Sequence, residues 1–277
     1  MAPPIRRGFL FAKAIRICYI EIMEYGYDQF KRDILKLTDI DLDSYKEKQM
    51  KRRIDSLLQT KGVEDYFRFV RMLRSDQVLL EEFIEYVTIN VSEFFRNPEQ
   101  WEILEKEVIP RLESKEKIRI WSAACSTGDE PYSLAMLFLK HFPKERFSIV
   151  ATDIDEKAIK MAKAGEYHPK SVEHMPKEYF QYFTRNENGK YLLSNEIKRM
   201  VTFKKHNLFK DEYPRMVDLL VCRNVLIYFT EDVKADIFRK FYKSISGGGV
   251  LFLGNTEQMM DYKEIGYKRI SSFFYEK

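Results

Sequence analysis

The sequence predicts an α/β protein with a Rossmann-like sheet, an N-terminal helical domain and a small antiparallel β insert. From Ile118 onward, strand patterns alternate with helix patterns, which is typical of a parallel sheet. Before that point, apolar residues recur only at helical spacing. The turn signal Asn186-Glu187-Asn188-Gly189 interrupts the alternation. The chain has 277 residues, 45% of them hydrophobic, so it is long enough to bury a core in each part.

The N-terminal part is expected to form a helical domain over residues 23–95. Its helices are predicted where apolar residues recur at helical spacing or between clear stop signals. They cover 27–37, 45–58, 63–73 and 77–87, and Thr60-Lys61-Gly62 ends the second of them. Residues 1–22 have a basic start and an apolar stretch. Because Lys13 and Arg16 interrupt that stretch, we interpret residues 1–22 as an extension outside both domains rather than as a targeting signal.

The second domain is expected to span residues 96–277, beginning with a helix over 101–112. Strands and helices then follow in turn. The predicted strands are 118–123, 147–152, 217–222 and 250–254, and the predicted helices are 131–141, 156–164 and 232–244. Strand-like segments at 190–193 and 198–205 follow the turn signal and predict an antiparallel insert over about 186–205. Residues 267–276 are expected to form a final hairpin.

The turn from Ser122 to Pro131 joins the first strand of the sheet to a helix. Such a junction directs the N–H groups of a helix N-terminus toward the carboxyl edge of the sheet, where nucleotide-like cofactors bind. A dinucleotide loop has three glycines, whereas this turn has only Gly128, followed by Asp129 and Glu130. These acids would repel a pyrophosphate but tolerate a cofactor with a cationic centre. Glu130 is open to two interpretations, a helix cap or a neighbour of that cation.

Asp153 and Asp155 follow the second predicted strand. An acid at this position commonly accepts hydrogen bonds from ribose hydroxyls. Asp155 is the better N-cap for the next helix, so Asp153 is the better ligand candidate. Cys125 and Cys222 also lie at strand ends, but neither has a histidine close in sequence, so we interpret both as core residues.

Two further segments place polar residues near the predicted cleft. Arg96 lies at the junction of the two domains. It is either a residue of the cleft or an ordinary linker arginine. Arg223 and Asn224 follow the third predicted strand, where side chains face the cleft of a parallel sheet. Tyr228 follows them, with aromatic packing as the alternative.

The charge pattern limits the partners. A net charge of +4 is too small to indicate nucleic acid, and no helix-turn-helix or aromatic RNA-binding pattern is present. No apolar run is long enough to span a bilayer, and widely spaced cysteines give no disulfide or zinc pattern. Six positive charges against two negative ones lie between Lys46 and Lys61, including Lys51, Arg52 and Arg53. This run is either a solvated face or a surface for an acidic partner.

Together, five ordered motifs resemble the chemotaxis receptor methyltransferases, the CheR family. They cover nearly everything after residue 22 and read TINVSEFFR at 88–96, WSAACSTGDEPYS at 121–133, ATDID at 151–155, HNL at 206–208 and CRNVLIYF at 222–229. The resemblance implies a cytoplasmic enzyme in signal transduction, using S-adenosylmethionine and leaving S-adenosylhomocysteine. It would methylate glutamate side chains on chemoreceptor cytoplasmic helices, as a monomer without nucleic acid or membrane insertion.

The resemblance also implies roles for individual residues. Arg96 and Tyr228 are the positions that it suggests for catalysis. The residues implied to contact the cofactor are Asn90, Ser92, Arg96, Glu130, Asp153, Asn207, Leu208, Arg223 and Asn224. The basic segment, with Lys51, Arg52 and Arg53, gains a plausible target in the acidic face of a receptor methylation helix.

The chemistry agrees with these residue types. S-adenosylmethionine carries a sulfonium cation and no phosphate, which suits an acidic turn with one glycine. A glutamate carboxylate is already an anion at neutral pH, so the reaction needs no general base. Some family members bind a receptor C-terminal peptide through the insert, but the short loop 186–190 favours direct recognition of the methylation region. Alternatives are a methyltransferase for another protein or a small molecule, and a binding module without catalysis.

Overall fold

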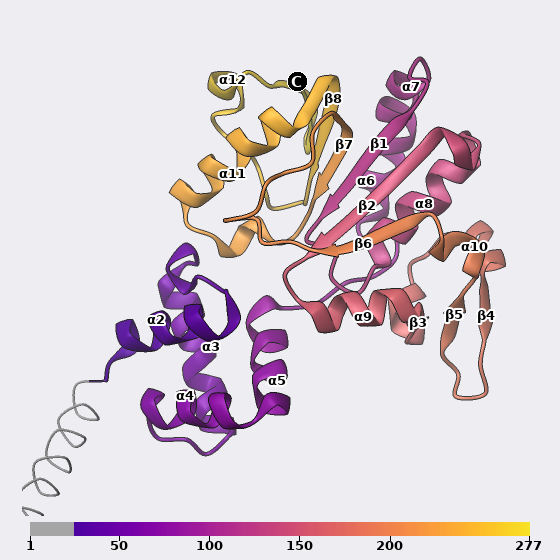
Figure 1. The fold of residues 1–277 in the computed structure, drawn as a ribbon. Helices are drawn as coiled ribbons and strands as arrows, with labels where there is room; N and C mark the ends of the chain where they lie inside the picture. The colour runs from indigo at the N-terminus through magenta and orange to yellow at the C-terminus, as the bar shows by residue number, and fades with distance from the viewer. Residues whose placement is uncertain (1–24) are drawn as a thin grey trace, which may run out of the picture. The chain divides into compact units, whose positions relative to one another are not determined.

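The computed structural model describes residues 25–277, so the extension expected over 1–22 lies outside the described part. The chain divides into two compact units between Val87 and Thr88 (Figure 1). The sequence analysis predicted this boundary after residue 95. In the structure, the segment from Thr88 to Phe95 belongs to the second compact unit instead. Within residues 25–277, no helix has the length and apolar character needed to cross a bilayer.

From residue 25 onward, the first unit is built from four α-helices packed around aromatic side chains. Phe30, Phe69 and Phe83 are fully buried and contact one another, because each lies on the apolar stripe of its helix. The predicted helices are therefore present, with bounds that differ by a few residues. They are α2 (Tyr27–Thr38), α3 (Glu47–Thr60), α4 (Tyr66–Ser75) and α5 (Gln77–Thr88), with a 3-10 turn at Leu42–Ser44.

The second unit contains a seven-stranded sheet in the order β6-β2-β1-β7-β8-β10-β9. The pairings from β6 to β8 are parallel, and β10 is antiparallel to both neighbours. The final hairpin was predicted correctly. The strands are β1 (Ile118–Ala123), β2 (Phe147–Asp153), β6 (Val201–Lys205), β7 (Val217–Cys222), β8 (Ile245–Leu253), β9 (Lys268–Ser271) and β10 (Phe274–Glu276).

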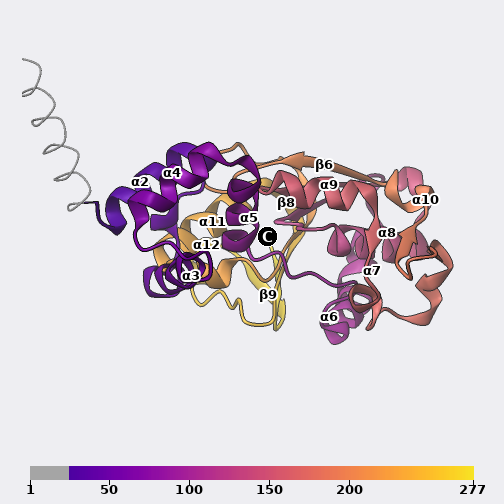
Figure 2. The same ribbon diagram turned by 90° about the horizontal axis from the view of Figure 1, so that it is seen from below.

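Helices cover both faces of this sheet (Figures 1 and 2). On one face, α8 packs over Ile118 and Ile120 as part of the main apolar core. On the other face, Phe241 of α11 contacts Trp121 edge to face. The helices are α6 (Pro98–Ile103), α7 (Ile109–Leu112), α8 (Asp129–His141), α9 (Glu156–Ala164), α10 (Asn195–Lys198), α11 (Glu231–Ser244) and α12 (Tyr262–Ile265), with one π turn, Leu104–Val108, between α6 and α7.

The antiparallel insert differs in extent from the prediction. Its sheet has the order β3-β5-β4, with β3 (Glu166–Tyr167), β4 (Phe183–Arg185) and β5 (Tyr191–Leu193). The turn signal at 186–189 does join β4 to β5. The segment 198–205, however, was wrongly assigned to the insert, because β6 pairs in parallel with β2 at the edge of the main sheet. The apolar alternation of Val201 and Phe203 suits either position.

Candidate active site

The loop between β1 and α8 forms the floor of the candidate site. Ser122, at the end of β1, donates a hydrogen bond from Oγ to Glu130 Oε1 at 2.8 Å. Gly128 precedes α8 with φ 91°, and a Cβ there would lie 2.8 Å from Ala162 Cβ in α9. The single glycine is therefore needed for the close approach of two helices. This requirement is independent of any phosphate.

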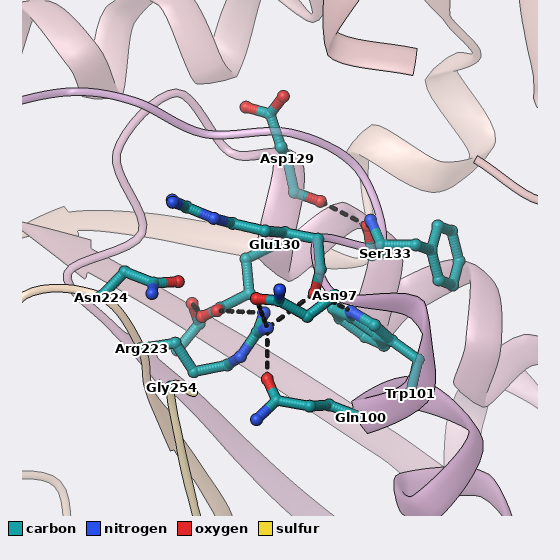
Figure 3. A network of polar contacts seen from close by, with 12 residues as sticks. Asn97, Gln100, Trp101, Asp129, Glu130, Ser133, Arg223, Asn224 and Gly254 are labelled. Atoms are coloured by element: carbon teal, nitrogen blue, oxygen red, sulfur yellow. Dashed lines mark hydrogen bonds and ion pairs between the residues drawn. The ribbon is translucent and has the colours of Figure 1, made fainter. Parts of the chain in front are cut away.

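Arg223 lies at the centre of a buried polar network (Figure 3). Its side chain is 1% exposed, and Nη1 lies 3.5 Å from Glu130 Oε2. Nη2 donates to the Arg96 carbonyl at 2.6 Å and to Gln100 Oε1 at 2.7 Å, while Trp101 and Phe252 face the guanidinium. Glu130 thus neither caps its helix nor lies free, because it is paired with Arg223. The structure brings the predicted Glu130, Arg96 and Arg223 together.

Arg96 is fixed by its backbone. Its carbonyl oxygen accepts from Arg223 and, at 3.0 Å, from Trp101 Nε1. Its half-buried guanidinium donates to the Val91 carbonyl at 3.0 Å. A guanidinium has five N–H donors in a planar fork, so donors remain for a carboxylate ligand.

Asp153 is buried at the carboxyl end of β2. Its two oxygens accept from the backbone N–H groups of Ser126 at 2.7 Å and Asp155 at 3.0 Å. Because a carboxylate accepts up to about four hydrogen bonds, capacity for further donors remains. Asp155 caps α9 by accepting from Lys157 N and Ala158 N, as predicted.

Asn90 and Ser92 reach the same loop from the segment that precedes Arg96. Asn90 Nδ2 donates to Asp155 Oδ2 at 2.6 Å, and Ser126 Oγ donates to Asn90 Oδ1 at 3.1 Å. Ser92 lies near Asp129, and its hydroxyl lowers the pKa of that acid. Asn90 is therefore an anchor between the 88–92 segment and the sheet, and any contact with a ligand would be additional to that role.

The remaining predicted residues lie in loops that follow β6 and β7. Asn207 and Leu208 are buried, and Asn207 Oδ1 accepts from Phe209 N at 2.9 Å, which closes a tight turn. Asn224 follows Arg223 directly. Tyr228 is half-buried in a 3-10 turn, Leu226–Tyr228.

Backbone strain is concentrated in the segments that form this site. Left-handed φ values cost a non-glycine residue about 1–3 kcal/mol and persist only where surrounding contacts enforce them. Most such residues in the described part of the chain lie in the 88–97 segment, the β1–α8 loop and the β7 loop, namely Ile89, Phe95, Asn97, Ala124, Ser126 and Asn224. The site is therefore a rigid arrangement held by its hydrogen bonds.

Burial controls the protonation of the acids. Burial raises the pKa of Asp153 to about 6, against the opposing effect of the backbone donors of Asp155 and Ser126. It raises the pKa of Asp129 to about 6 as well, against the hydroxyls of Thr127 and Ser92. The pKa of Glu130 is also raised by burial, with Arg223 as the main opposing charge.

The buried thiols are poor nucleophiles. Burial raises the pKa of Cys125 and of Cys222 well above the ordinary value for a thiol, so both remain protonated at neutral pH. This agrees with their interpretation as core residues. Among residues 25–277, no group of three or more histidine, cysteine and acidic side chains is placed to hold a metal ion.

Sequence reasoning missed three residues of the site. Gln100 and Trp101 contact Arg223 and the Arg96 carbonyl from the first turns of α6. Glu257 is buried and accepts from the backbone of the β7 loop. The Asn97-Pro98 helix start could have drawn attention to Gln100, whereas no local signal marks Glu257.

The basic segment lies on α3 in the first unit. Lys51 pairs with Asp55 at 3.1 Å and faces the Tyr66 ring, and Arg53 donates to the Tyr86 carbonyl at 2.6 Å. Arg52 is exposed, as is Lys48 one turn earlier. Of the three predicted substrate-binding residues, Arg52 therefore carries the most accessible charge.

Comparison with known proteins gives consistent matches over both units. The family model described as CheR methyltransferase, SAM binding domain matches residues 90–272, and the one described as CheR methyltransferase, all-alpha domain matches 26–88. A chemotaxis protein methyltransferase of Listeria innocua is 41% identical over 92% of this chain and 98% of its own length. Chemotaxis protein methyltransferase 2 of Vibrio cholerae is 34% identical over 93% of this chain and 91% of its own length.

Proposed function

The chain belongs to the CheR methyltransferase family, and on this premise we propose that it transfers a methyl group from S-adenosylmethionine to glutamate carboxylates of chemoreceptor cytoplasmic helices. The observation that carries the proposal is the Glu130–Arg223–Arg96 network beside the acidic β1–α8 loop. The acids of this loop would repel a phosphate, and the Arg96 guanidinium beside it has remaining donors that suit a carboxylate. The product would be a glutamate methyl ester.

The residues present fit the cofactor that the family uses. Ser122 to Pro131 contains no lysine or arginine, so nothing in this loop would neutralise a pyrophosphate. Glu130 and Asp153 offer carboxylates suited to an ammonium group and to ribose hydroxyls, respectively. As part of the same proposal, the residues around the bound cofactor also include Asn90, Ser92, Asn207, Leu208 and Asn224. When bound, the cofactor supplies an electrophilic methyl group on a sulfonium centre.

The protein's contribution is mainly positional. The substrate glutamate is ionised at neutral pH, so no side chain has to remove a proton. We propose that Arg96 orients that carboxylate through its planar fork and that the Tyr228 hydroxyl donates a hydrogen bond near the transferred group. Alignment of this kind supplies up to roughly 7–11 kcal/mol of barrier reduction. The rigid backbone around Arg96 is suited to it.

A methyl-transfer assay tests the reaction class. Radiolabelled S-adenosylmethionine is incubated with the protein and receptor-containing membranes, and label released by mild base is counted. Base-labile label on the receptor is expected, because a carboxyl methyl ester hydrolyses in base. Label that resists base would indicate a different acceptor atom. Label on another protein or on a small molecule would favour the alternative substrate classes, and no label would favour a binding module.

Docking to the receptor is proposed to use the basic face of α3, with Lys51, Arg52 and Arg53. We expect the double charge reversal Lys48→Glu/Arg52→Glu to raise the KM for receptor about tenfold at low salt, with a smaller effect at high salt because ions screen exposed charges. Lys36→Glu, on α2, is the matched control for an exposed charge of the same unit. Equal KM values for the double variant and the control would contradict docking through α3.

Cofactor affinity is expected to depend on pH through Asp153. The pKa of Asp153 is raised to about 6, so the carboxylate accepts ribose hydroxyls at pH 7.5 and becomes protonated as the pH falls through 6. Calorimetric affinity for S-adenosylhomocysteine should therefore fall between about pH 7 and pH 5. Asp153→Asn should bind more weakly and lose this pH dependence. If the dependence survives in that variant, the titrating group is a different acid, with Asp129 the first candidate.

A further inference from the structure

A buried carboxylate organises the loop after β7. Glu257 is 5% exposed, and its oxygens accept from four backbone N–H groups. Oε2 accepts from Asn224 at 2.7 Å and from Gly254 at 2.9 Å. Oε1 accepts from Leu226 at 2.7 Å and from Ile227 at 3.3 Å. Burying an acid is costly, and four charge-assisted hydrogen bonds offset that cost.

The loop that Glu257 holds could not keep its shape by local sequence alone. Asn224 has φ 62°, a left-handed value. Leu226 and Ile227 open the 3-10 turn that carries Tyr228, and the first N–H groups of such a turn have no partner within it. The Glu257 carboxylate supplies that partner for Leu226 from 31 residues further along the chain.

Gly254 allows the two loops to approach. A Cβ at this position would lie 2.6 Å from Glu257 Oε2 and 2.9 Å from the Asn224 backbone nitrogen. Real Cβ atoms do not come this close to backbone, so any side chain would force the loops apart. Figure 3 shows Gly254 and Asn224 on the side of Arg223 away from Trp101. The β8 end and the β7 loop therefore form one unit, closed by Glu257.

We infer that Glu257 is a positioning residue that sets the conformation of the loop from Arg223 to Tyr228 and thereby presents Asn224 and Tyr228 to the cofactor and substrate. The part that concerns Asn224 and Tyr228 rests on the proposed function. Glutamine cannot replace glutamate in this role, because its amide nitrogen would face backbone N–H groups that need an acceptor.

Hydrogen exchange on the full chain tests the inference directly. In Glu257→Gln, the amides of Asn224, Leu226 and Ile227 should exchange about tenfold faster or more, the equivalent of one lost hydrogen bond. The amides of Leu219 to Val221 in β7 should keep their protection. Glu264→Gln, an exposed acid in α12, is the matched control. Unchanged exchange at 224–227 in Glu257→Gln would overturn the inference.

Ligand binding gives a second readout. Affinity for S-adenosylhomocysteine should fall about tenfold in Glu257→Gln, and kcat should fall more than the KM for receptor changes. Gly254→Ala keeps the carboxylate but forces the loops apart, so it should give the same pattern and serves as the test if Glu257→Gln does not fold. A loss of stability with exchange at 224–227 and affinity both unchanged would make Glu257 merely structural.

Failure of this inference is distinguishable from failure of the proposed function. Exchange and S-adenosylhomocysteine binding are measured without receptor, so they report on the loop whatever the substrate is. If the wild-type protein forms no methyl ester on receptors, the proposed substrate is contradicted. If Glu257→Gln still shows faster exchange at 224–227 and weaker S-adenosylhomocysteine binding, the role of Glu257 in cofactor binding stands.

Discussion

Arg223→Ala is expected to destabilise the second unit by about 3–5 kcal/mol, the usual cost of removing one partner of a buried ion pair. The substitution would leave Glu130 buried without its counter-charge and would remove the donor to Gln100 and to the Arg96 carbonyl. Methyl transfer should be lost as well, since Arg96 loses one of its two backbone anchors. Urea unfolding followed by tryptophan fluorescence measures the stability.

The matched control is Arg239→Ala. Arg239 is 59% exposed and only loosely paired with Asp236 at 3.8 Å, so its loss should change the free energy of unfolding by less than about 0.5 kcal/mol. Equal unfolding midpoints for the two variants would show that the buried network contributes nothing to stability. Adding Glu130→Gln to Arg223→Ala should restore part of the loss, because the uncompensated charge is then removed.

Arg96→Ala is expected to lower kcat about 100-fold, within the range found when one preorganised donor to a reacting group is removed. Stability should change little, because the substitution retains the carbonyl that accepts from Arg223 and Trp101 and removes only the exposed hydrogen bond to the Val91 carbonyl. The affinity for S-adenosylhomocysteine should fall less than kcat. Initial rates of methyl-ester formation and calorimetry measure the two effects.

Two further variants sharpen the Arg96 experiment. Arg96→Lys keeps the charge but lacks the planar fork, so most of the loss should persist if orientation of a carboxylate is the role. Tyr228→Phe removes a single hydroxyl and should lower kcat by about tenfold, the equivalent of one hydrogen bond. Wild-type turnover in Arg96→Ala would refute the proposed role of Arg96.

The parallel strands were predictable because each is a short, apolar run. The strands over Ile118–Ala123 and Val217–Cys222 have the same bounds in the structure as in the prediction. The strand predicted at 250–254 is longer and begins at Ile245, because Ile245 pairs with Val217 and the glycine run lies in a register shift between that pair and Leu219–Val250. Local pattern identifies such elements, whereas pairing partners decide where they end.

The placement of β6 shows the limit of local pattern. Residues 198–205 follow a hairpin signal, so the pattern favoured an antiparallel partner nearby. In the structure, Val201 to Lys205 pairs with β2. Helix α9 and the whole antiparallel insert lie between these two strands in the chain. A strand with one apolar face fits either sheet, and only the competition between distant partners selects one.

Three candidate site residues could be proposed from the sequence because each directly follows or ends a predicted strand. Asp153, Arg223 and Asn224 lie at the carboxyl edge because parallel strands end there together. Glu130 was left between a helix cap and a neighbour of the cofactor's cation, and its pairing with Arg223 was not part of either interpretation. Gln100 and Glu257 were not anticipated, because their partners lie 123 and 33 residues away, respectively.

The sequence alone determined the fold class, the acidic character of the β1–α8 loop and the ordered motifs of the family. These depend on residue types and short spacings, which carry their physical meaning without the rest of the chain. Only the tertiary structure decided which buried charges are paired, which carboxylate fixes the β7 loop, and that Gly128 serves helix packing. A buried charge is stable only beside a partner, and the fold, rather than sequence proximity, chooses that partner.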